Sequence, residues 1–257
     1  PRSCRGHPCL VQRVAACAPA KIGRYIMHLS QSTTKRRLLA AAIVVGMVYW
    51  LGSMGRSGIA FPEFADWPKP LVIALKATAT GLLVAAAWVA ATTPVRRLLA
   101  ISLSVIWVAD IVLAVRFVVL AGMIFVVAHV IAITAYAKVR DPRKATPPYL
   151  ILSASVPVVG MAWLLFATQG TEISLLMSLF PAFSLVSAAV ALQSRYPLWS
   201  LGAGTVIFSL SDIVGVMSLT LENGIGLSWL VWLTYFAGLS LIVWTLIQAP
   251  EPENPQG

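Results

Sequence analysis

Charged side chains are scarce in this chain. Asp, Glu, Lys and Arg make up 11% of its 257 residues, whereas a soluble domain carries about 25%. Hydrophobic residues make up 59%, and the mean hydropathy is +0.85. So few charges cannot cover the surface of a soluble domain. The composition therefore excludes that class and predicts an integral membrane protein.

Cysteine is missing from every long apolar run. The three cysteines, Cys4, Cys9 and Cys17, all lie within the first seventeen residues. Cys4 and Cys9 flank His7, but their spacing fits no zinc template. His129 is the one histidine within an apolar run, and a haem usually needs two axial ligands. We therefore expect neither a metal site nor a cofactor.

Long apolar runs follow one another along the chain, separated by short polar breaks. Each run approaches the ~20 residues that cross a bilayer as a helix. The runs are continuously apolar rather than alternating, which favours helices. The sequence predicts an all-α polytopic membrane protein of about eight transmembrane helices in one bundle, with spans at 38–54, 70–91, 98–116, 118–137, 149–168, 173–193, 198–219 and 227–247.

Two tails flank this transmembrane domain of residues 38–247. Residues 1–37 are basic, and we expect them to form a disordered tail. Within that tail, residues 1–26 precede the first methionine, Met27, and we expect an upstream extension or a leader there. Residues 248–257 are acidic and rich in proline, which is typical of a disordered tail.

Basic residues are distributed unequally between the two ends of the predicted helices. Fifteen of the nineteen Lys and Arg residues precede the first span or follow the second, fourth and sixth. The positive-inside rule then predicts cytoplasmic termini, and we expect a bacterial-type plasma membrane. Topology and contact with anionic membrane lipids account for the net charge of +10, so no nucleic-acid partner is expected. The oligomeric state is not specified.

Two aspartates, Asp110 and Asp212, lie late within apolar runs. A carboxylate in hydrocarbon costs roughly 2.5–3.5 kcal/mol on insertion scales. At ~1.5 Å of rise per residue, both carboxylates lie ~20 Å from the cytoplasmic side. Lys76 and Tyr235 approach the same layer from the opposite side, and His129 lies deeper, near the midplane. Polar groups that converge in an apolar bundle predict a functional site.

Structural roles for these side chains remain open. Asp110 could pair with Lys76 only to hold two helices together. Ser211 could donate to the backbone of its own helix. Similar Val-Ile-aromatic segments precede both aspartates, and this weak repeat suggests two parallel four-helix halves with a site between them.

Motifs around the two aspartates resemble those of the YhhN-like lysoplasmalogenase family. In residues 108–130, the matching positions are Asp110, Phe117, Gly122 and Ala128-His129. In residues 204–214, they are Gly204, Phe208, Ser211 and Asp212. Two further matches, at the start of the second span and within the last, are Lys69-Pro70-Leu71 and Thr234-Tyr235. The resemblance covers residues 38–247.

This resemblance implies hydrolysis of the vinyl-ether bond of lysoplasmalogens, giving a fatty aldehyde and a glycerophospho-alcohol. Protonation of a vinyl ether gives an oxocarbenium ion that water captures, which requires an acid and a base. We expect Asp110 and Asp212 to fill these two roles, in either order. His129, Ser211 and Tyr235 would orient the reacting groups, and Lys76 and Lys69 would face the phosphate of the lysophospholipid or ether-lipid substrate.

Two other classes of membrane protein use paired intramembrane carboxylates. A small proton- or cation-coupled transporter would use Asp110 and Asp212 as ion sites. Vesicle flux without hydrolysis would identify that function, whereas aldehyde release would identify the hydrolase. An intramembrane aspartyl protease is disfavoured because the expected Gly-x-Gly-Asp pattern is missing.

Overall fold

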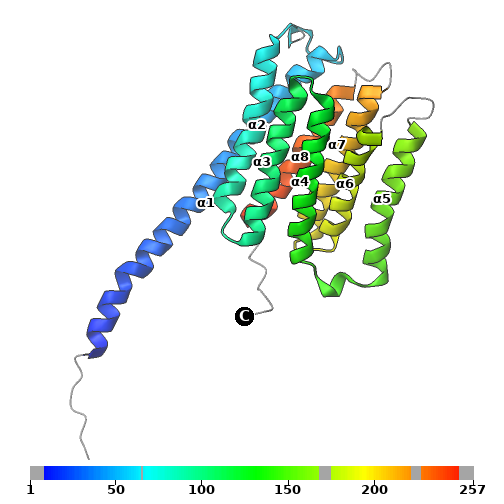
Figure 1. Ribbon diagram of the computed structural model, residues 1–257. Helices are drawn as coiled ribbons and strands as arrows, with labels where there is room; N and C mark the ends of the chain where they lie inside the picture. The colour runs from blue at the N-terminus through cyan, green and yellow to red at the C-terminus, as the bar shows by residue number, and fades with distance from the viewer. Residues whose placement is uncertain (1–8, 65, 168–174, 221–226, 249–257) are drawn as a thin grey trace, which may run out of the picture.

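The computed structural model describes residues 9–64, 66–167, 175–220 and 227–248 (Figure 1). This part of the chain is helical, as predicted. Its eight α-helices are α1 (Cys9–Arg56), α2 (Lys69–Ala90), α3 (Pro94–Ala114), α4 (Val118–Lys138), α5 (Pro147–Ala167), α6 (Leu175–Leu192), α7 (Ala203–Thr220) and α8 (Ser228–Gln248). Short helical turns precede α2, α5 and α7, namely η1 (Pro62–Phe64), η2 (Pro142–Lys144) and η3 (Leu198–Gly202).

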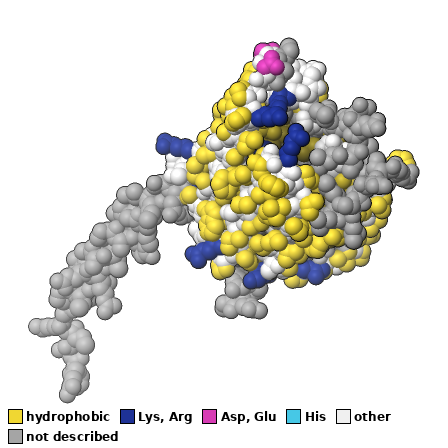
Figure 2. Space-filling view, turned by 45° about the horizontal axis from the view of Figure 1, so that its top comes forward, with side chains coloured by type: hydrophobic (Ala, Val, Ile, Leu, Met, Phe, Trp, Pro, Cys, Tyr) yellow, Lys and Arg dark blue, Asp and Glu magenta, His cyan; other side chains and the backbone are white. Residues whose placement is uncertain are grey.

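Seven helices in the described part are long and apolar enough to cross a membrane. They match seven of the eight predicted spans, and α6 contributes a shorter apolar stretch, Ser178–Leu192. Hydrophobic side chains cover most of the surface drawn in Figure 2. On α5, for example, Ile151 is 69% exposed and Phe166 is 71% exposed. The composition-based prediction of an integral membrane protein is confirmed.

The first helix is longer than the predicted span 38–54. Helix α1 begins at Cys9, so residues 9–37, expected as a disordered tail, continue it toward the N-terminus. Its membrane-compatible part is Thr33–Arg56. Lys and Arg limit how much of a helix hydrocarbon can accept, but they are good helix formers. The helix therefore does not end where the apolar run ends. Residues 1–8 and 249–257 lie outside the described part.

The helices form a closed ring. Neighbours around it are α1, α2, α3, α4, α6, α7 and α8, and α8 packs back against α1 and α2. Helix α5 lies outside the ring against α6 and α7 (Figure 1). In the predicted repeat of two four-helix halves, α1 and α5 are the corresponding first helices. They pack differently, because α1 belongs to the ring and α5 lies outside it. Asp110 on α3 and Asp212 on α7 come from opposite parts of this ring.

One end of the bundle carries most of the described basic loop residues, and we call it the basic end. It holds the α2–α3, α4–α5 and α6–α7 connections and the end of α8, and the N-terminal part of α1 extends beyond the bundle from this end (Figure 1). Backbone bonds join two of these connections: Asp141 N–H donates to Gln193 O at 2.8 Å, and Arg195 N–H donates to Val139 O at 2.8 Å. Lys144 donates to Ser194 O at 2.6 Å. Burial lowers the pKa of Lys144, and the neighbouring Asp141 partly offsets this.

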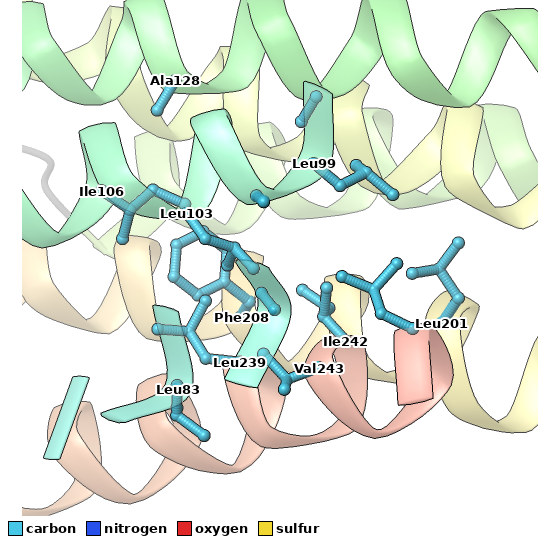
Figure 3. Close-up of a cluster of buried hydrophobic side chains, with 14 of the residues drawn as sticks. Leu83, Leu99, Leu103, Ile106, Ala128, Leu201, Phe208, Leu239, Ile242 and Val243 are labelled. Carbon is cyan, nitrogen blue, oxygen red and sulfur yellow. The ribbon is translucent and has the colours of Figure 1, made fainter. Parts of the chain in front are cut away.

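A hydrophobic core fills the half of the ring that lies toward the basic end. Its buried side chains include Leu83, Leu99, Leu103, Ile106, Phe208, Leu239, Ile242 and Val243 (Figure 3). Small residues bring α7 and α8 close together beside this core. A Cβ atom on Gly238 would lie 2.7 Å from the carbonyl oxygen of Gly204, so the two backbones are in direct contact. Such contacts between small residues are a common way for membrane helices to associate.

Candidate functional site

A cavity of about 700 Å³ occupies the other half of the ring. Ligand cavities in proteins usually measure ~300–1,000 Å³. Every helix of the ring contributes to its wall. The lining residues come from the helix halves that lie away from the basic end, and the polar ones are Tyr49, Lys76, Asp110, Arg116, Ser211, Asp212, Ser218, Ser228 and Tyr235.

Asp110 is buried and has two partners on other helices. Lys76 Nζ on α2 lies 2.8 Å from Asp110 Oδ1, which is an ion pair and a hydrogen bond. The hydroxyl of Tyr235 on α8 donates to Asp110 Oδ2. Lys76 Nζ also lies 5.6 Å from the centre of the Tyr235 ring and 5.9 Å from that of Trp232. Aromatic faces attract a cation at such distances. The charge of Asp110 is thus balanced within the bundle.

Asp212 has a different environment. It is 6% exposed on α7, and its Oδ2 lies 3.6 Å from Nε2 of the buried His129 on α4. That separation exceeds a normal hydrogen bond. Neither of these two atoms has a hydrogen-bond partner among the described residues. Buried polar atoms without partners are uncommon and often mark functional positions.

Phe208 lies between the His129–Asp212 pair and the Tyr235–Asp110 pair. It lies one helical turn before Asp212 on α7. Its ring centre is 5.7 Å from the His129 ring and 5.4 Å from the Tyr235 ring. Because Phe208 also belongs to the hydrophobic core (Figure 3), it marks the boundary between the packed half of the ring and the cavity.

The structure brings most of the predicted site residues to this cavity. Five of them line it, namely Asp110, Asp212, Lys76, Tyr235 and Ser211. His129 does not line the cavity, but its Nε2 lies 3.6 Å from Oδ2 of Asp212, which does. Their roles in catalysis stay predictions.

Ser211 and Lys69 differ from the rest of that set. Ser211 donates to the carbonyl oxygen of Phe208 at 2.6 Å. This is the hydrogen bond within its own helix that the sequence left open as a structural role. Lys69 is exposed at the first residue of α2 and is not part of the cavity wall.

Several residues of the wall were not predicted from the sequence. Tyr49 lies in the first apolar run, where it resembles an interfacial aromatic residue. Arg116 served in the sequence only to mark the end of one predicted span before the next begins. Gly122 lines the cavity on α4, and a Cβ atom there would meet nothing within 4 Å. No group of three or more metal-ligating side chains occurs in the described part of the chain.

The arrangement can support acid–base chemistry on an apolar substrate. One carboxylate is paired with a cation, and the other faces an imidazole at 3.6 Å. Two carboxyl groups with such different partners are suited to different roles in a reaction. The remainder of the wall is mainly apolar, which suits a hydrocarbon chain.

The model of the YhhN family matches residues 71–246, which contain most of α2, all of α3 to α7 and most of α8. All of the lining residues except Tyr49 fall within the matched range. No curated protein and no solved structure matches the chain.

Proposed function

Since the chain belongs to the YhhN family, we propose that it is a membrane hydrolase that cleaves the vinyl-ether bond of lysoplasmalogen-type lipids. The observation that carries this proposal is the pairing of two differently partnered carboxyl groups in one cavity with apolar walls. A single-chain ether lipid offers the matching chemistry: a hydrocarbon tail, and one acid-labile bond near its polar end.

The reaction proceeds in two stages. An acid transfers a proton to the β-carbon of the vinyl ether, and the remaining cation is an oxocarbenium ion. Water adds to that ion and gives up a proton to a base, which yields a hemiacetal. Proton transfer to the glycerol oxygen then breaks its bond to the former vinyl carbon. The products are a glycerophospho-alcohol and a fatty aldehyde, and the net reactant is one water molecule.

Asp212 is the better candidate for the acid. A buried carboxyl group without a full cation partner holds a proton more readily than one in an ion pair. Asp110 is paired with Lys76 and accepts from Tyr235, and both are contacts that a carboxylate makes. In that state it would stabilise the positive charge of the oxocarbenium ion, which is the electrostatic role that often dominates catalysis.

His129 is suited to position the proton of Asp212. Its Nε2 faces Asp212 Oδ2 at 3.6 Å without another partner in the described residues. A small movement would complete a hydrogen bond between them. After the first proton transfer, the Asp212 carboxylate would accept the proton of the attacking water, which restores the acid for the next cycle.

The test is aldehyde release from lysoplasmalogen by the purified protein in detergent. Asp110→Asn and Asp212→Asn should each lower the turnover by at least ~100-fold, through loss of an electrostatic stabiliser and of a catalytic acid, respectively. Asp141→Asn is the matched control, because Asp141 lies in a loop at the basic end, outside the cavity. Normal turnover in either cavity variant would refute the mechanism.

A proton- or cation-coupled transporter would use the same two carboxyl groups. The lipid assay separates the two functions. Flux across sealed vesicles without aldehyde release from any vinyl-ether lipid would favour transport and reject the hydrolase.

A further inference from the structure

Arg116 lies at the mouth of the cavity, between α3 and α4. It lines the cavity together with Val118 and Val119, the first residues of α4. From Asp110, α3 continues away from the basic end for four residues, ~6 Å of rise, and Arg116 lies two residues beyond its last residue, Ala114. The hydrophobic core fills the other half of the ring (Figure 3), so the mouth faces away from the basic end.

The backbone of Arg116 is in the left-handed region, with φ at 70°. A residue with a Cβ atom adopts that region at a cost of ~1–2 kcal/mol, and glycine fits it without strain. A bulky residue held in such a conformation near a cavity is a reason to look for a function of its side chain.

The guanidinium of Arg116 is available for an anion. Among the described residues that line the cavity, the cations are Lys76 and Arg116. Lys76 is engaged with Asp110 at 2.8 Å, whereas the Arg116 side chain makes no hydrogen bond or ion pair with any described residue. Arginine presents a planar set of donors that matches a phosphate group.

The neighbours of Arg116 place it where lipid head groups lie. Val115 is 52% exposed and Phe117 is 64% exposed. An exposed arginine between two exposed apolar residues at a helix end is typical of the membrane–water interface.

We infer that Arg116 binds the phosphate of the lipid at the mouth of the cavity, so that the substrate is a phosphate-bearing, single-chain ether lipid taken from the leaflet opposite the basic end. This inference rests on the proposed function for the nature of the lipid. The dimensions agree: the phosphorus and the β-carbon of the vinyl ether are about seven bonds apart, or ~8–9 Å in an extended chain. Helix α3 rises ~6 Å from Asp110 to Ala114, and Arg116 lies two residues farther along the chain, so the two separations are comparable.

The role of Arg116 is tested by binding, independently of catalysis. The probes are a lysophospholipid with a non-cleavable alkyl ether and the corresponding alkylglycerol without phosphate, each with a brominated tail that quenches tryptophan fluorescence. Trp232 in the cavity wall serves as the reporter. We expect the wild-type protein to bind the phosphate lipid about tenfold more tightly than the neutral one, as for a charge-assisted hydrogen bond.

Arg116→Gln should remove that preference, and Arg116→Lys should keep part of it. Arg116→Gly should also remove it while raising the unfolding temperature, because glycine fits the left-handed backbone. Arg56→Gln is the matched control, since Arg56 is exposed and does not line the cavity. Loss of the preference in the control, equal binding of both probes by the wild type, or an unchanged preference in Arg116→Gln would overturn the inference.

The outcome separates this inference from the proposed function. Binding that depends on Arg116, without aldehyde release from the cleavable lipid, would reject the hydrolase and leave the phosphate site standing. Aldehyde release from lysoplasmalogen at the same kcat/KM by Arg116→Gln and the wild type would reject the phosphate site and leave the hydrolase standing.

Discussion

Replacing Asp110 with asparagine should destabilise the bundle far more than the same change at Asp212. Asp110→Asn leaves the Lys76 ammonium without its carboxylate, although the neutral amide can still accept from it. Removing one partner of a buried ion pair costs ~3–5 kcal/mol. The side chain of Lys76 is 19% exposed and lines a cavity, and two aromatic rings remain near its ammonium group. The lower end, ~3 kcal/mol, therefore applies.

The expected shift is large enough to measure. For a chain of this size, 1 kcal/mol changes the unfolding temperature by ~2–4 °C, so Asp110→Asn should lower it by about 6–12 °C. Asp212→Asn removes no cation partner and should change the stability by less than ~1 kcal/mol. Both variants should lose aldehyde release. Thermal unfolding in detergent, followed by tryptophan fluorescence, provides the comparison.

A double-mutant cycle separates the ion pair from other effects. Lys76→Met leaves the Asp110 carboxylate uncompensated and should also be strongly destabilised. Combining Lys76→Met with Asp110→Asn removes both charges, so the double variant should unfold at a higher temperature than Lys76→Met alone. If the losses of the single variants simply add, or if Asp110→Asn and Asp212→Asn lower the unfolding temperature equally, the contrast between the two carboxyl groups is refuted.

Further variants at three positions probe the cavity and the packing beside it. His129→Gln should lower turnover by ~100-fold with the fold retained, and normal turnover would remove His129 from the proposal. Gly122→Ala should fold and turn over normally, because its methyl group meets nothing within 4 Å. In Gly122→Phe the larger side chain should occupy the cavity and lower kcat/KM at least tenfold. Equal rates for the two variants would mean that the substrate lies elsewhere. Gly238→Ala should cost ~1–3 kcal/mol through overpacking against α7, since its Cβ would lie 2.7 Å from Gly204 O, and a stable variant would contradict the close backbone contact.

Much of the fold could be predicted because bilayer thickness and helical rise are fixed quantities. Apolar runs gave the helices to within a few residues, except in α1, where the helix continues beyond the apolar run. The same arithmetic put Asp110, Lys76 and Tyr235 at one depth, and in the structure these three side chains are in contact. Depth along a helix follows from residue number alone.

The sequence by itself determined that this is a helical membrane protein with polar groups concentrated in one layer. Only the tertiary structure decided which groups meet, because rotation about each helix axis depends on packing against neighbours. That packing paired Lys76 with Asp110 and left His129 facing Asp212 across a gap. It also excluded Lys69 from the cavity wall and included Arg116. The left-handed backbone of Arg116 follows no helical periodicity, so the arginine at the mouth could be recognised only after the chain was folded.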